Sequence, residues 1–385
     1  MEEVPFIFPS DEHTAWSIMI VLYPYITGLV AGAFVVSALY HVFHKEELKP
    51  VARLALVTSF CFAAFATVPL LLHLHHPERC FQVMITPSTT SAIAGFGFIY
   101  NAYMLILVVE IWLVFRPTIA YRAKSHDGIV GMIYWCLALG CTNISERAKA
   151  VDDWMIKALS VIGIPVACVL HGYVGFLFGA VKANPWWSTA LMPIIFLMSA
   201  IVSGIAALIL LYLFISKRRG VAADPKCVAS MARYLWLFLV MAVTLEGMEI
   251  LHMAYEAGSE WEVLHELITV HLFTSYIVIQ VLIGSLIPLL LLPVAFLPKI
   301  ATKPKLLYTV SGIASVLILI QVFAMRWNVV MGGQMFSKSF RGFTEIDLHW
   351  YTRESPYVAA VVMVLPLIAL WVASKLLPLW QESEA

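Results

Sequence analysis

Long apolar segments recur from one end of the chain to the other. Each is about 20 residues or longer, enough for a helix to cross roughly 30 Å of hydrocarbon. Short polar connections separate nine such segments, which cover residues 16–43, 51–75, 91–115, 154–182, 187–216, 229–256, 265–297, 306–330 and 357–379. This pattern predicts an all-α fold, a polytopic transmembrane helical bundle of about nine spans.

A tenth apolar run, 128–142, is shorter, and its placement decides the topology. As a helix it would reach about 22 Å, less than the hydrocarbon thickness. If it does not cross and the N-terminus lies outside, 18 lysines and arginines fall inside and 6 outside; if it crosses, the split is 11 to 13. Basic residues favour the cytoplasmic side. We therefore predict nine spans (ten only if 128–142 crosses), with the N-terminus outside and the C-terminus inside.

The composition agrees with a membrane protein and argues against other classes. Hydrophobic residues make up 61% and charged residues 12% of the chain, and the mean hydropathy is +0.88. Ordinary globular proteins are about 25% charged. The net charge of zero gives no reason to expect a nucleic-acid partner. The six cysteines include no Cys-x-x-Cys pair, so an iron–sulfur cluster or zinc site of the usual spacing is not expected.

Ionisable side chains inside the apolar segments are candidate functional residues, because a membrane makes them costly. On the predicted topology Glu110 lies toward the inner half. The others lie in or near the outer half: His73, His171, Glu246, Glu249, His252 and Arg326. Two interpretations stay open at this point. These groups either pair with one another in a structural network or line a hydrated, ligand-binding cavity that opens to the outside.

A haem is one redox interpretation of the histidines. A b-type cytochrome needs axial histidines that face one another from neighbouring helices. His73 and His171 could form such a pair at one depth, but no second pair lies toward the inner side. An electron path through two haems is therefore not supported.

Four motifs resemble the NrfD/PsrC family of quinone-interacting membrane subunits. The segment Trp16–Gly32 resembles the opening helix of the family's first bundle, and His73–Arg79 resembles its Asp-Leu-Gly-x-Pro-x-Arg loop. His171-Gly-Tyr with Gly175 resembles its helix-four motif. Arg326–Gln334 resembles the C-terminal signature of the larger branch, which includes HybB, DsrP, QrcD and ActC. The four motifs occur in the family's order and cover most of the chain.

The resemblance implies a quinone-reactive subunit of an oxidoreductase complex in a bacterial or archaeal cytoplasmic (inner) membrane. The expected cofactor is menaquinone or ubiquinone, with no haem or metal in this subunit. The quinone would bind near the outer face in a first four-helix bundle, 16–182, followed by a second bundle, 187–379, within a single membrane domain, 1–385. The expected partners are a periplasmic, ferredoxin-like iron–sulfur subunit and a molybdopterin-type or multihaem cytochrome c subunit.

The resemblance also gives candidate roles to individual residues. His73 and His171 would exchange protons with the quinone and contact its carbonyls, and Glu110 would pass protons from the inner side. Candidate quinone-binding residues are Tyr25, Gly28, Asn101, Tyr103, His171 and Arg79. Candidate proton-pathway residues are Glu110, Glu246, Glu249, His252 and Arg326.

Two details modify these assignments. Gly28 and Gly32 form a small-xxx-small pattern, which favours close helix packing. The family's loop Asp is His73 here, and histidine changes charge near neutral pH whereas aspartate does not. A different pH dependence of the site is therefore expected.

Two other functions remain as alternatives. A secondary transporter or ion channel would use Glu246, Glu249 and Arg326 as coupling residues. Inverted repeats with broken helices would favour it, and the sequence contains no convincing repeat. A b-type cytochrome membrane anchor is the second alternative, which a reduced-minus-oxidised spectrum distinguishes.

Overall fold

The fold is a bundle of long helices. The computed structural model describes residues 13–88, 90–297, 303–336, 342–348 and 350–380. Within these ranges nine helical segments are long and apolar enough to cross a membrane. β-structure in the same ranges is limited to two isolated bridges, His13 with Glu345 and Phe336 with Phe343. The predicted all-α, multi-pass bundle is confirmed.

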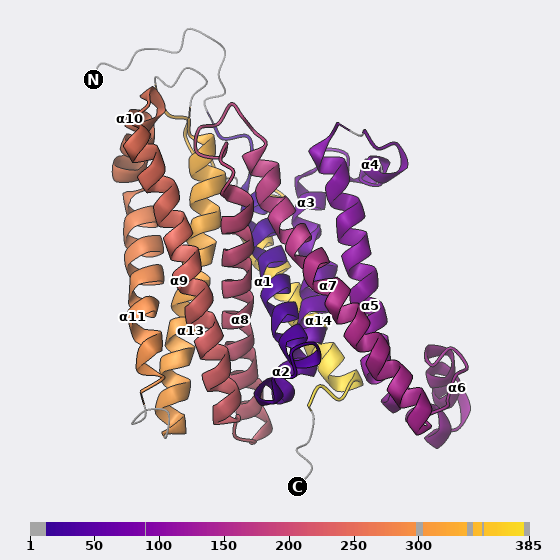
Figure 1. The fold of residues 1–385 in the computed structure, drawn as a ribbon. Coiled ribbons are helices and arrows are strands. Elements are labelled where there is room, and N and C mark those ends of the chain that lie inside the picture. Colours follow the sequence, from indigo (N-terminus) through magenta and orange to yellow (C-terminus); the bar gives the residue numbers. More distant parts are fainter. Residues whose placement is uncertain (1–12, 89, 298–302, 337–341, 349, 381–385) are drawn as a thin grey trace.

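The spans alternate in direction along the bundle (Figure 1). They are α1 (Ile18–His41), α2 with α3 (Lys49–Ala66, Val68–His73), α5 (Ala92–Ser125), α7 (Glu146–Gly179), α8 (Met192–Arg219), α9 (Pro225–Glu256), the π-helical η4 with α11 (Phe273–Leu286, Ile287–Val294), α13 with the π-helical η5 (Pro304–Trp327, Asn328–Gly332) and α14 (Pro356–Leu376). Short helices are η1 (Glu46–Leu48), η2 (Pro77–Arg79), α4 (Gln82–Ile85), α6 (Gly128–Leu137), α10 (Ser259–Glu266) and η3 (Leu267–His271).

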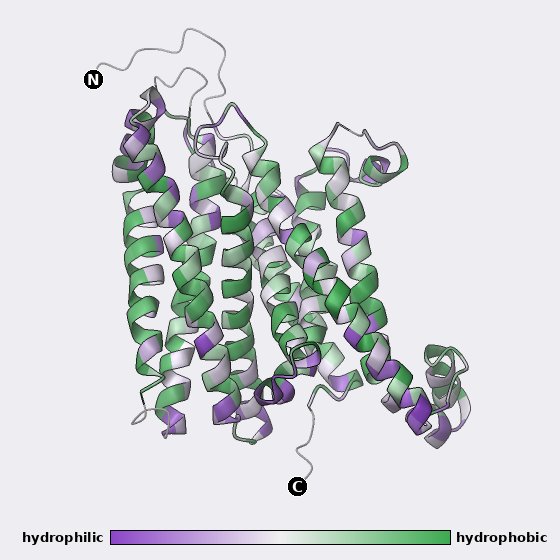
Figure 2. Ribbon diagram, in the orientation of Figure 1, coloured by the Kyte–Doolittle hydropathy of each residue, from purple (hydrophilic) through white to green (hydrophobic). Residues whose placement is uncertain are grey.

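The two ends of the bundle are polar and its middle is apolar (Figure 2). The end that carries α4 and α10 corresponds to the predicted outside, and the end that carries α6 to the predicted inside. These are called the outer and inner ends below. Their assignment to the two sides of a membrane stays a prediction.

The short apolar run forms a separate helix that is too short to span. α6 has 10 residues, so it covers about 15 Å. It packs against α5 at the inner end, where the indole Nε1 of Trp112 donates to the carbonyl of Leu137 over 2.8 Å. The described residues therefore have nine candidate spans rather than ten.

Two spans are longer than the apolar pattern predicts. α5 continues to Ser125 although its apolar run ends at residue 115, and α7 begins at Glu146 rather than 154. Arg116 and Asp152, 5% and 6% exposed, join these extensions by a hydrogen-bonded ion pair in which Nη2 is 2.5 Å from Oδ2. The Ser145 hydroxyl caps the start of α7. An ion pair between neighbouring helices leaves no trace in a hydropathy pattern, and the predicted boundaries are wrong for that reason.

The helices form two rings that share a contact. α1, α2, α5 and α7 contact one another in one ring, and α8, α9, η4 with α11, and α13 form the other. α1 packs along α8 as extensively as along α2, which joins the rings. α14, placed by sequence in the second bundle, packs mainly on α2, with further contacts to α1 and α3. The sequence places the boundary between the two bundles at residues 182–187. That boundary stays a proposal, in which α14 belongs with the first ring.

Glycines allow α1 and α8 to approach closely. A Cβ atom on Gly32 would overlap the backbone of Ile201 and Gly204, and one on Gly28 would press on Ala200 and Ser203. Small residues at such crossings let helix backbones touch. Gly28 is therefore a packing residue against α8 in this structure.

Candidate functional site

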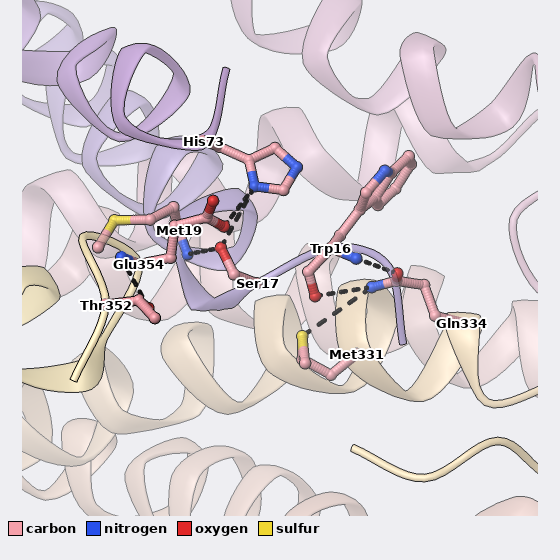
Figure 3. A network of polar contacts seen from close by, with 8 residues as sticks. All are labelled: Trp16, Ser17, Met19, His73, Met331, Gln334, Thr352 and Glu354. Carbon is pink, nitrogen blue, oxygen red and sulfur yellow. Dashed lines mark hydrogen bonds and ion pairs between the residues drawn. The ribbon is translucent and has the colours of Figure 1, made fainter. Parts of the chain in front are cut away.

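A titratable pair lies at the outer end of the bundle (Figure 3). His73 is the last residue of α3, and Glu354 lies just before α14. Nδ1 of His73 is 2.7 Å from Oε2 of Glu354, and the hydroxyl of Ser17 is 3.4 Å from the same nitrogen. Each side chain of the pair is 20% exposed. Water can therefore reach a pair that the protein holds in a defined geometry.

The surroundings of Glu354 favour its charged form. Burial raises the pKa of this carboxyl. Hydrogen bonds from Ser17 and His73 and the nearby charges of His73 and Arg353 together lower it by more, so the pKa of Glu354 is below its usual value. A carboxylate only accepts hydrogen bonds, so the contact with His73 places a proton on Nδ1. No hydrogen bond from the described residues reaches Nε2 of His73. That nitrogen is available to a ligand.

A second set of contacts holds the start of α1 in place. The backbone N–H of Trp16 donates to Oε1 of Gln334 over 2.7 Å (Figure 3), and the Trp16 ring stacks on Trp187 at 5.1 Å. The Trp187 indole N–H donates to the carbonyl of Val329 over 2.6 Å. The Arg326–Gln334 motif therefore positions the N-terminus of α1, beside Ser17.

The interior of the first ring contains a separate polar site. His171 and Tyr103 are 2% and 0% exposed, and their ring centroids are 6.5 Å apart, edge to face. The Tyr103 hydroxyl is 3.0 Å from Oγ of Ser59. Nε2 of His171 is buried without a hydrogen-bond partner. The described contacts do not join His171 to His73, and the two histidines have different neighbours.

Glu110 lies deeper in the same ring. It is 0% exposed; Oε1 accepts a hydrogen bond from Ser160 over 2.5 Å, and Oε2 has no partner. One helical turn further inward, Val114 lines a cavity of about 560 Å³ that is formed by α1, α2, α5 and α7 at the inner end. Other buried polar atoms without partners on the helices of the first ring are Tyr23 Oη, Ser37 Oγ, His41 Nε2 and Thr58 Oγ1. Unpaired buried polar atoms often mark ordered water.

The second ring contains a chain of amide groups around Glu246. Nε2 of Gln280 donates to Oε2 of Glu246 over 2.9 Å, and Nε2 of Gln321 lies 3.4 Å from both carboxylate oxygens. Nδ2 of Asn328 donates to Oε1 of Gln280 over 2.8 Å. Gln280 lies in the π-helical segment η4 and Asn328 in the π-helical segment η5, and such segments are frequent at functional sites.

Arg326, on α13, packs against α8. Its guanidinium is 3.7 Å from the centroid of the Phe196 ring, and Nη2 donates to Oγ of Ser199 over 2.7 Å. Among the described carboxylates none is within ion-pair distance of it, although Glu246 and His171 are near enough to interact electrostatically. Arg326 therefore makes no direct ion pair with a described glutamate, although the structural-network interpretation would have allowed one.

Glu249 and His252 belong to a cavity at the outer end of the second ring. The cavity has a volume of about 490 Å³, and both residues line it. Glu249 is 7% exposed, whereas His252 is exposed and lies 3.4 Å from Glu256. Glu249 is one turn from Glu246 on α9, so the cavity leads toward the amide chain.

The remaining candidate residues are dispersed. The Tyr25 hydroxyl donates to the carbonyl of Leu319 over 3.2 Å, and its ring faces α13 rather than the first ring's interior. Asn101 is exposed and bonds to the carbonyl of Gly97. Arg79 is 65% exposed, near Glu78. The residues predicted to bind the quinone therefore lie in several separate places in the structure.

Sequence reasoning missed Glu354, and it included Gln334 only as the end of a family motif, without a role. Both lie close to the ends of apolar spans in polar connections, where carboxylates and amides are ordinary. Only the packing of α14 beside α3 brings Glu354 to His73. Over the described ranges, no three His, Cys, Asp or Glu side chains gather in a way that could hold a metal ion.

Comparisons with known proteins give consistent matches. Residues 8–338 match the family model described as "Polysulphide reductase, NrfD". A selenate reductase subunit of Mesobacillus selenatarsenatis is 36% identical over 216 residues, 54% of this chain and 50% of that protein. The match therefore spans half the length of that relative. Protein NrfD homolog of Haemophilus influenzae is 25% identical over 341 residues, 85% of this chain and 98% of that protein.

An archaeal relative aligns over a longer stretch. The Hdr-like menaquinol oxidoreductase integral membrane subunit of Archaeoglobus fulgidus is 24% identical over 379 residues, 92% of this chain and 81% of that protein.

Proposed function

This chain belongs to the polysulphide reductase NrfD family, and from that membership we propose that it is the quinone-reactive membrane subunit of a respiratory oxidoreductase complex. It binds menaquinone or ubiquinone at the outer end and exchanges electrons with an iron–sulfur subunit docked there. The name of the Archaeoglobus relative, a menaquinol oxidoreductase subunit, supports a quinone as the ligand.

The contact between His73 and Glu354 is the observation that carries this proposal. A quinone head needs hydrogen-bonding groups at its carbonyls and a group that exchanges protons with water. His73 fits both requirements, because Glu354 occupies Nδ1, Nε2 is available and the side chain is 20% exposed.

The mechanism follows from the two ring nitrogens. A bound quinone supplies two-electron chemistry that is coupled to the uptake or release of two protons. When Nε2 of His73 carries a proton it would donate to a quinone carbonyl, and when it does not it would accept the proton of a quinol hydroxyl. In both states Nδ1–H remains hydrogen-bonded to Glu354, which fixes the ring orientation. The Glu354 carboxylate stabilises the imidazolium that forms when both nitrogens carry protons. At the exposed edge of the pair, His73 would exchange that proton with water: taking it up for quinone reduction, releasing it after quinol oxidation.

An inner proton route is a finer part of the proposal. The inner cavity, the unpaired Nε2 of His41 and the unpaired Oε2 of Glu110 support a path for protons toward the interior of the first ring. His171 and Tyr103 lie further along that ring and would continue the path. If protons reach the quinone this way, turnover moves charge across the membrane although electrons stay at the outer end.

A second candidate function is an ion-coupled transporter. It is favoured by the chain of Glu246, Gln280 and Asn328 and by the cavity beside Glu249. Within the first proposal the same groups, with Arg326 and His252, form a second proton pathway.

The decisive experiment is purification of the tagged chain from its native membranes. We expect an iron–sulfur subunit to co-purify, and its clusters to be reduced by a menaquinol or to reduce a menaquinone. The matched preparation carries His73→Ala, which should retain the partner subunit but lose the quinone-dependent signal.

Other results would contradict the proposal. A chain that purifies without redox subunits and shows no quinone-dependent signal would favour the transporter. A b-type α band in the reduced-minus-oxidised spectrum of the chain alone would favour the cytochrome anchor.

A further inference from the structure

An apolar groove of about 450 Å³ lies between α1, α13 and α14. Apolar atoms line it almost completely, and each helix contributes residues spaced by one helical turn. On α1 these are Ile18, Leu22 and Tyr25. The hydroxyl of Tyr25 is already bonded to the carbonyl of Leu319, so it adds no free polar group.

The outer end of the groove adjoins the His73–Glu354 pair. Ile18 directly follows Ser17, which contacts His73, and Pro356 is two residues after Glu354. From Ile18 to Tyr25 the groove extends over about 10 Å, at 1.5 Å per residue. A polar cluster that water reaches thus continues into an apolar groove of about two helical turns.

We propose that this groove binds the isoprenoid tail of the quinone whose head contacts His73. The inference rests on the proposed function and adds where the ligand enters, between α1 and α14. That position is outside the interior of the first ring, where Tyr103 and His171 lie.

The chemistry of the groove and its mouth selects this occupant. The groove requires a long apolar chain, and the mouth offers hydrogen-bonding groups beside the Glu354 carboxylate. A phospholipid would bring a phosphate against that carboxylate, and like charges at short distance repel. A polyprenyl quinone has an uncharged head with two carbonyl acceptors. It therefore fits both parts.

The tail dependence of binding tests the inference. The membrane complex is placed in nanodiscs, and dissociation constants are measured for menadione, which has no tail, and for a menaquinone with a short isoprenoid tail. The blocking variant is Ala360→Phe, because Ala360 lines the groove with an exposed side chain and has room for a larger one. The matched control is Val361→Phe, at a residue that is 60% exposed and does not line the groove.

The expected result is a selective effect. Ala360→Phe should raise the dissociation constant of the tailed menaquinone about tenfold, as expected from losing contact with roughly two buried methylene groups. The dissociation constant of menadione should stay within about twofold of the wild-type value. Val361→Phe should bind both ligands as wild type does. A menaquinone with a photoreactive group on its tail should label peptides of α1, α13 or α14.

Each other outcome has one meaning. Suppose that wild type binds both ligands but Ala360→Phe leaves the ratio of their two dissociation constants unchanged, or that the photolabel appears on α5 and α7. The groove assignment is then wrong, and the proposed function stands. If wild type binds neither ligand, the proposed function itself fails. If Ala360→Phe binds neither ligand, the position of the photolabel in the wild-type protein decides whether the groove holds the tail, because that result does not depend on a variant.

Discussion

Nδ1 of His73 lies 2.7 Å from Oε2 of Glu354, although the two residues are 281 positions apart in the sequence. The contact joins the end of α3 to the connection that leads into α14. A histidine with one nitrogen held by a carboxylate presents the other in a fixed direction, which is an arrangement suited to proton exchange. The role of His73 therefore depends on a partner from the last span.

Removing the His73 side chain should strongly slow quinone-linked electron transfer. Loss of a hydrogen bond to the developing charge costs about 2–4 kcal/mol, or roughly 30- to 1,000-fold in rate. The measurement is quinol-dependent turnover of the purified complex for His73→Ala. His75→Ala, at an exposed residue two positions away, is the control and should keep wild-type activity. Wild-type turnover in His73→Ala would remove His73 from the site.

The carboxylate partner determines what His73→Asp should do. This substitution restores the residue of the family's loop, but it places a second carboxylate beside Glu354, where like charges repel. The single variant should therefore lose most activity. His73→Asp combined with Glu354→Gln should recover it, with a shifted pH optimum. Equal turnover in the single and double variants would mean that the two positions act independently.

The pair should also make stability depend on pH. The pKa of Glu354 is lowered in the folded protein, so its contribution is complete above the unfolded value, about 4.3, and is lost as the pH falls through the folded value. Thermal unfolding of wild type and Glu354→Gln should differ most near neutral pH and converge in acid. Glu78→Gln is the control, because its carboxylate is 64% exposed. A difference that grows in acid would contradict this sign.

The inner proton route predicts a separation of turnover from charge movement. Glu110→Gln should retain much of the quinol turnover but reduce the membrane potential generated in liposomes, since it alters proton supply rather than quinone contact. His41→Gln should act in the same direction, because His41 lines the inner cavity. A potential-sensitive dye gives the measurement. Unchanged charge movement in Glu110→Gln would remove the inner route.

The topology predicts different access to two exposed positions. Val221, 59% exposed after α8, should lie inside, and Tyr351, 100% exposed before α14, should lie outside. Val221→Cys and Tyr351→Cys are made in a background without the native cysteines, because Cys136 and Cys141 are exposed as well. A membrane-impermeant reagent on intact cells should label only the second variant. Labelling of both would overturn the nine-span orientation.

The number and position of the spans could be predicted from the sequence, because membrane crossing depends on the local length of an apolar run. The same reasoning correctly left 128–142 as a short helix, α6. It failed where a contact between helices extends them, as Arg116 and Asp152 do for α5 and α7. Sequence also located the deep ionisable residues Glu110 and His171, because their cost in a membrane is a property of each position.

The partners of these residues were decided by the tertiary structure. Which side of α1 faces α8 depends on the close approach of Gly32 and Gly204, and that packing turns Tyr25 toward α13. The position of α14 beside α2 and α3 brings Glu354 to His73. An apolar run specifies how far a helix reaches through the bilayer, but its rotation and neighbours follow from shape complementarity between distant segments, which no single segment contains.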